Sequence, residues 1–225
     1  MIISSKIICK FWVLFAIITL LSAKTFASSE CDQFKTTPKI TTTINYGTPS
    51  YTLVPKEAII SVSGLKNPLR TMGLTIADFQ IQYSITIDKN PTPNGICVNI
   101  NTIDFNIGYN SLDIIIDEKY KENSCQYNEI KKHEEGHIKI YQEELKYYGK
   151  LITEEMKILM ENLKPFLTSS DATKTKINKK IDNLLKNDEK LKILKNRLEQ
   201  AIIDKNLAHD SDEEYIRIKN SCTSW

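Results

Sequence analysis

Apolar and polar residues alternate along one stretch of the chain, and the pattern continues beyond a loop. Between residues 79 and 87 every second residue is apolar, which predicts a strand with one buried face. A turn-rich segment follows at 90–95, and apolar residues then resume from Cys97 to Tyr109, so we expect an antiparallel hairpin. The apolar phase changes near Asn101 or Thr102, and this change predicts a β-bulge.

Two shorter segments add to the predicted sheet. Residues 40–46 alternate in the same way and end at a Gly-Thr-Pro-Ser turn, which predicts a first strand. Residues 112–116 either form another strand or lead into the helix that follows. We therefore predict a small antiparallel sheet within residues 39–116.

The apolar period becomes helical from Asn128 onward. The stripe of a first helix recurs every three or four positions: His133, His137, Tyr141, Leu145, Tyr148, Ile152, Met156, Leu159 and Leu163. Pro165 and the polar segment 168–171 end this helix, and a second apolar stripe predicts another helix from about Thr173 to Asp204. The predicted fold class is therefore α+β, with the small antiparallel sheet followed by a helical hairpin at 120–206.

The two ends of the chain differ from this central part. Residues 1–27 carry Lys6 and Lys10 before an apolar run and end in Thr-Phe-Ala, so we interpret them as a secretory signal peptide. A retained anchor is the alternative, but the apolar run is short for a membrane span. We expect one domain at 28–210, a C-terminal tail at 211–225, and no stable membrane anchor after cleavage.

Charge and glycine content argue against two classes of partner. Removing residues 1–27 takes away three lysines and no acid, which leaves 27 basic and 28 acidic residues. A nearly neutral chain does not favour nucleic-acid binding. The chain has only seven glycines and no glycine-rich segment that opens a helix, so we do not expect nucleotide binding.

The cysteines point to an oxidising compartment. Cys31, Cys97, Cys125 and Cys222 remain after cleavage, and an even number in an exported chain predicts two disulfides. Three connectivities are open, and free buried thiols are the alternative. We expect a periplasmic or secreted protein.

A five-residue motif on the first helix carries the predicted chemistry. His133-Glu134-Glu135-Gly136-His137 places two imidazoles one turn apart on one helix face, as zinc binding requires. Zinc would lower the pKa of a bound water to about 7, and Glu134 would act as its general base. A solvated charged helix is the alternative. Because the chain has only three histidines, two of them four positions apart around a glutamate favour the metal site over this alternative.

A catalytic zinc site needs a third protein ligand. Glu154, Glu155 and Glu161 are candidates of the type in which a glutamate on a following helix completes the site. The long motif that ends in Gly-x-x-His is excluded, because Ile140 and Glu143 occupy the required positions.

His209 is the remaining histidine and the other candidate third ligand. In a helical hairpin that turns near residue 169, the second helix runs back toward the motif and its end approaches it. Asp204 or Asp210 would then orient the ring of His209 through a hydrogen bond. A surface histidine in an acidic tail is the alternative.

The order of these features resembles that of the predicted secreted zinc-dependent proteases of bacteria, a domain family of unknown function. The resemblance covers about residues 40–210: a β region with Gly95-Ile96-Cys97, the His-Glu-x-x-His helix, and a return helix that ends in an Asp-x4-His pair at Asp204 and His209. The family tail has the form Tyr-Asp-x-x-Thr-x-His-Gly, and this chain departs from it at Ile203, Leu207 and Asp210. The resemblance implies zinc binding by His133, His137 and His209.

The predicted function is that of a zinc-dependent metallopeptidase acting on a peptide or protein substrate, with Zn²⁺ as cofactor. A non-catalytic exported binding module with a structural or vestigial zinc site is the alternative. A zinc hydrolase of cell-wall amides or esters would use the same residues.

Overall fold

The sheet of the protein is organised around one long central strand. The computed structural model describes residues 29–63, 71–169 and 174–225, so the predicted signal peptide lies outside the described residues. Strand β4 (Gly95–Asp117, 23 residues) pairs antiparallel with β3 (Gly73–Thr92, 20 residues). The predicted hairpin is therefore confirmed. The predicted bulge is confirmed too, because Thr86 faces Thr102 while Ile87 faces Ile100, which leaves Asn101 without an opposite residue.

The predicted small antiparallel sheet is wrong. Strands β1 (Lys39–Asn45) and β2 (Pro49–Val54) both run parallel to β4, and β5 (Phe166–Thr168) adds a short antiparallel pair. The five-stranded sheet is thus mixed and has two very long strands, and with the helices on it the fold is α/β. Alternation along a strand indicates which face is buried, but it carries no information on the direction of the neighbouring strand.

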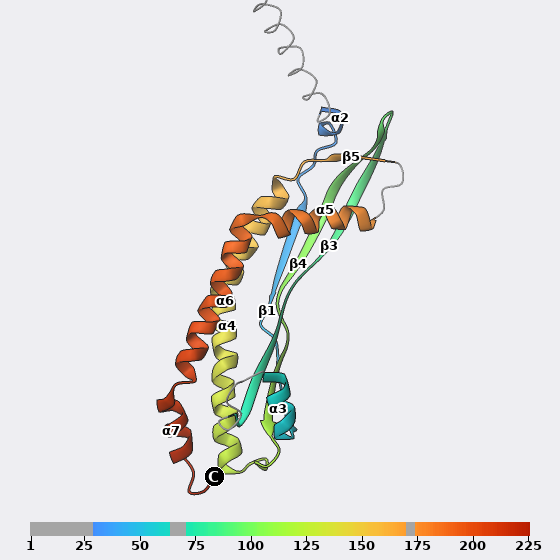
Figure 1. The fold of residues 1–225 in the computed structure, drawn as a ribbon. Coiled ribbons are helices and arrows are strands. Elements are labelled where there is room, and N and C mark those ends of the chain that lie inside the picture. The colour runs from blue at the N-terminus through green and yellow to red at the C-terminus, as the bar shows by residue number, and fades with distance from the viewer. Residues whose placement is uncertain (1–28, 64–70, 170–173) are drawn as a thin grey trace, which may run out of the picture.

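The helical part also differs from the predicted hairpin of two helices. Helix α4 (Cys125–Glu161) is a single helix of 37 residues, whereas the chain returns in two helices, α5 (Lys174–Asn187) and α6 (Glu189–His209). The break comes at Asp188, whose carboxylate caps α6 by accepting a hydrogen bond from the Leu191 backbone N–H at 2.8 Å. Helix α5 crosses the sheet, while α6 runs back alongside α4 (Figure 1).

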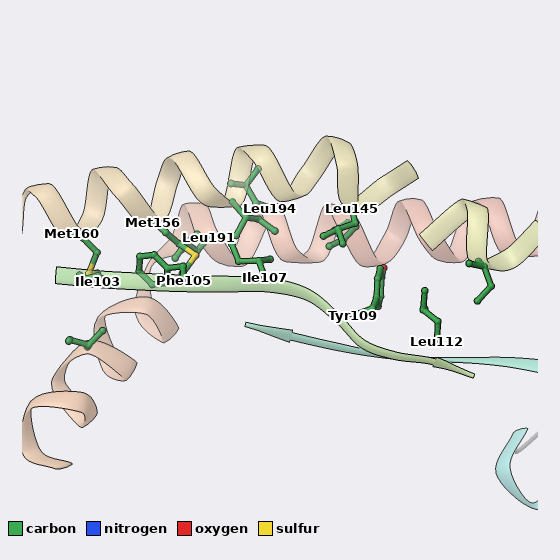
Figure 2. Packing of buried hydrophobic residues seen from close by; sticks show 14 of the residues in the cluster. Ile103, Phe105, Ile107, Tyr109, Leu112, Leu145, Met156, Met160, Leu191 and Leu194 are labelled. Carbon is green, nitrogen blue, oxygen red and sulfur yellow. The ribbon is translucent and has the colours of Figure 1, made fainter. Parts of the chain in front are cut away.

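The core lies between β4 and the α4/α6 pair. Alternate residues of β4 point toward the helices, and Leu145, Met156 and Met160 of α4 meet them together with Leu191 and Leu194 of α6 (Figure 2). Each of these side chains is at most 8% exposed. This packing fixes α6 against α4 and so determines which residues at its C-terminal end meet the start of α4.

Three short helices complete the described chain: α2 (Ser29–Asp32), α3 (Lys56–Ser63) and α7 (Asp212–Asn220). Disulfides join Cys31 to Cys97 and Cys125 to Cys222, which resolves the connectivity and indicates an oxidising environment. The second bond ties the segment after α7 to the first residue of α4. None of the helices described here combines the length and the apolar character needed to cross a bilayer.

Candidate metal centre

The motif lies near the beginning of α4, on the face that meets α6. Ser124 caps the helix, with its side chain accepting a hydrogen bond from the Tyr127 backbone N–H at 3.2 Å. His133 and His137 follow two to three turns later. Because α6 is antiparallel to α4, its last residues arrive beside these two histidines.

Three imidazoles gather at this point. The ring centroids of His133 and His137 are 4.9 Å apart, and the ring of His209 lies 4.5 Å from the first and 4.8 Å from the second. One nitrogen from each ring can be chosen so that all three lie within 4.8 Å of one another. The structure therefore brings together the two motif histidines and the distant histidine at 209.

A glycine in the motif admits the third ring. A Cβ built on Gly136 would lie 2.3 Å from His209 Nε2, so any side chain here would displace the imidazole. His209 Nε2 lies 2.9 Å from the backbone carbonyl oxygen of His133. A carbonyl oxygen only accepts, so Nε2 carries the proton and the lone pair is on Nδ1.

Polar side chains face the outer nitrogens, the Nδ1 atoms, of the other two rings. His137 Nδ1 donates to the amide oxygen of Asn206 at 2.9 Å, and His133 Nδ1 lies 3.5 Å from Glu214 Oε1. The bond to Asn206 places a proton on Nδ1 of His137, so a metal would bind this ring through Nε2, in place of the proton that Nε2 shares with Asp210. Glu214 is itself held by Arg217, which donates to both of its carboxylate oxygens at 2.7 and 2.8 Å.

Asp210 contacts the inner nitrogens of the motif histidines, which are their Nε2 atoms. Its Oδ1 lies 3.1 Å from His133 Nε2 and 3.0 Å from His137 Nε2. Burial raises the pKa of Asp210, but the hydrogen bonds from the two imidazoles outweigh it and hold the pKa well below the usual range. Burial lowers the pKa of His137, yet the bond to Asp210 and the charge of Glu134 leave it raised.

Glu134 is buried beside the rings. Glu134 is only 5% exposed, and its Oε2 accepts a hydrogen bond from Thr75 Oγ1 at 2.8 Å. A Cβ on Gly73 would lie 2.8 Å from Glu134 Oε1, so the start of β3 packs directly on this carboxylate. Burial raises the pKa of Glu134 and outweighs the lowering by the two histidines and by Thr75. A raised pKa suits a carboxylate that takes up and returns a proton.

A cavity of about 390 Å³ opens over these groups. Its walls come from the start of β3, from α4, and from the end of α6 with α7; Tyr141 and Tyr215 also line it. Burial raises the pKa of Tyr141, although its bond to Asn206 opposes the shift, so this phenol remains protonated and able to donate.

The other predicted residues fall in different places. Asp204 is exposed and accepts a hydrogen bond from Gln200 at 2.8 Å, so it does not orient His209. Glu154 forms an ion pair with Lys157, and Glu155 forms one with Lys190. Glu154 lies 17 positions after His137 on the same helix, which corresponds to about 25 Å along the helix axis. These glutamates are therefore too far from the rings to act as ligands.

The donor set fits a divalent cation. Each of the three imidazoles has one nitrogen within 4.8 Å of a nitrogen of the other two, and imidazole nitrogens are common ligands of zinc. Asn206, Glu214 and Thr75 were not predicted from the sequence, because polar residues on helices and strands give no periodic signal of their own. Glu214 lies in α7, which begins two residues after Asp210, and no spacing in the sequence links it to the motif histidines.

Comparisons of this chain with protein-family models, curated proteins and solved structures found no match. The resemblance to a bacterial protease family therefore stays a prediction, and the site has to be interpreted from its own geometry.

Proposed function

We propose that the protein is an exported zinc-dependent metallopeptidase in which His133, His137 and His209 bind zinc and Glu134 is the general base. The observation that carries this proposal is the position of Glu134, a buried carboxylate with a raised pKa beside three converging imidazoles. A structural metal site has no need of such a group. Three histidines that leave a fourth position open are typical of catalytic zinc.

Zinc held by these rings would supply a polarised water and a Lewis acid for the peptide carbonyl. Glu134 would take the proton of the attacking water and return it to the leaving amine. The hydrogen bond from Thr75 holds the carboxylate in place and leaves Oε1 as its second oxygen. Tyr141, a neutral phenol in the cavity wall, would donate a hydrogen bond to the developing oxyanion.

The first residues of β3 support a peptide as substrate. Gly73–Ala77 line or flank the cavity and pair with β4 on one side. Within the described residues no strand pairs with the opposite edge of β3. An extended peptide can therefore add to this edge and bring its backbone alongside the rings. The two disulfides support a periplasmic or secreted location.

A non-catalytic module with a structural zinc site is the second candidate. Asp210 favours it, because its carboxylate contacts both inner nitrogens and so offers a fourth protein ligand.

The substitution Glu134→Gln separates the two functions. We expect the purified protein to hold about one zinc per chain and to cleave a mixed peptide library. Glu134→Gln should keep the zinc and lose cleavage, whereas His137→Ala should lose both. Glu135→Gln, a change at the exposed neighbouring glutamate, is the matched control and should keep both. Zinc binding without cleavage by any variant would favour the structural site.

A further inference from the structure

One oxygen of Asp210 contacts both inner nitrogens of the motif histidines. The distances of 3.1 and 3.0 Å from Oδ1 to the Nε2 atoms of His133 and His137 place it between the two rings. The outer nitrogens face other groups, because His137 Nδ1 donates to Asn206 and His133 Nδ1 lies 3.5 Å from Glu214 Oε1. Asp210 is therefore on the side of the rings that faces a metal, unlike a carboxylate that orients a ligand from behind.

These distances match the spacing between two ligands of one zinc ion. With metal–ligand bonds of 2.0–2.2 Å in a tetrahedral site, neighbouring ligand atoms are about 3.4 Å apart. The Oδ1 atom lies within about 0.4 Å of that spacing from both nitrogens at once. These distances are thus compatible with one cation bound to His133, His137 and Asp210 in place of the protons they share.

The position of Asp210 in the chain leaves its side chain room to withdraw. It is the C-cap of α6, and Ser211, the next residue, is the N-cap of α7. Its side chain is 52% exposed at the cavity, whereas that of His137 is 10% exposed. Rotation about its own side-chain bonds can move the carboxylate into solvent without moving either helix.

We propose that Asp210 is a fourth protein ligand that closes the metal site at rest and has to withdraw before a substrate or inhibitor can bind the metal. This regulation rests on the metal site of the proposed function. Asp210 is thus both a contributor to metal affinity and a competitor of any incoming ligand.

The test compares Asp210→Asn and Asp210→Ala with Asp204→Asn, an exposed aspartate on the same helix that does not contact the rings. We expect both Asp210 variants to bind zinc at least about tenfold more weakly in chelator competition, as loss of a metal contact requires. Cobalt-loaded protein should show a changed visible spectrum in these variants. Acetohydroxamate, a ligand of open metal sites, should bind their cobalt forms about tenfold or more tightly than wild type.

The outcomes separate this proposal from the proposed function. Unchanged zinc affinity, cobalt spectrum and hydroxamate affinity in both Asp210 variants would overturn the role of Asp210 and leave the metallopeptidase proposal standing. Changes in all three without peptide cleavage by any variant would support Asp210 and contradict the peptidase. Far-ultraviolet circular dichroism and thermal unfolding identify any variant that is misfolded, and Asp210→Asn, which keeps the side-chain size, then decides.

Discussion

Gly136 and His209 are 73 positions apart, yet the imidazole of His209 fills the space that a side chain at position 136 would need. A Cβ there would lie 2.3 Å from Nε2 of the ring. The glycine inside the motif is therefore part of the candidate metal centre, because it lets the third imidazole reach the backbone of the helix that carries the other two.

The first prediction follows from this contact. Gly136→Ala should push His209 away and weaken zinc binding by at least about tenfold, since the ring cannot keep its bond to the His133 carbonyl. Gly149→Ala is the control on the same helix: its Cβ would meet Leu145 Cδ1 at 3.1 Å, about 18 Å along the helix from His137. Both changes add the helix propensity of alanine, about 1 kcal/mol.

Zinc affinity measured by chelator competition distinguishes the two glycine variants. Gly149→Ala should leave it unchanged. Equal zinc affinity in Gly136→Ala and wild type would show that His209 is not a ligand.

The second prediction concerns Asn206. Its amide oxygen accepts the Nδ1 proton of His137 at 2.9 Å and so fixes the tautomer in which Nε2 can bind a metal. Asn206→Ala should lower zinc affinity about 10- to 100-fold. Gln200→Ala, an exposed change on the same helix, should have no effect. Nitrogen-15 chemical shifts of the His137 ring in the metal-free protein should show the loss of the Nδ1-protonated form, which a general loss of stability would not produce.

How far the sequence predicts this site depends on the kind of information each residue carries. His133 and His137 are predictable because a spacing of four places two residues on one helix face. His209 is predictable in outline, because a chain reversal returns it to the motif, although the return uses α5 and α6 and not one helix. Asn206 and Glu214 become visible only once α6 and α7 are docked on α4.

The parallel strands show the corresponding limit for the fold. Residues 40–46 alternate as an edge strand should, and β1 forms there. Its parallel pairing with β4 depends on the path of the chain between the two strands, which local alternation does not encode. The turn that joins β3 to β4 is short, and for this reason the hairpin was predictable.

Glu214 gives the third prediction. It is the acidic group that faces His133 Nδ1, at 3.5 Å, and Arg217 fixes it while also donating to Glu129 at 2.9 Å. Glu214→Ala should lower zinc affinity about tenfold, as for other carboxylates that orient a metal-bound histidine. Glu213→Ala, at the exposed neighbouring glutamate, is the matched control. If the two variants bind zinc equally well, Glu214 only anchors α7.

The disulfide between Cys125 and Cys222 gives the last prediction, because it ties α7 to the helix of the motif. The bond spans 97 positions of sequence, and that between Cys31 and Cys97 spans 66, so replacing either pair by serine should cost about 2–4 kcal/mol of stability. The two pairs differ in what they hold. Cys222 comes after α7, the helix that carries Glu214 and forms part of the cavity wall. Cys31 lies in α2 at the other end of the molecule (Figure 1).

Thermal unfolding and zinc affinity should therefore separate in the two double variants. Both should unfold at a lower temperature, but only Cys125→Ser with Cys222→Ser should also bind zinc more weakly, by about tenfold, because α7 and Glu214 lose their anchor. Equal zinc affinity in the two double variants would mean that Arg217 and Glu129 hold α7 in place without the covalent bond. Adding Arg217→Ala to the Cys125/Cys222 variant should then lower the affinity, since it removes the remaining contact that positions Glu214.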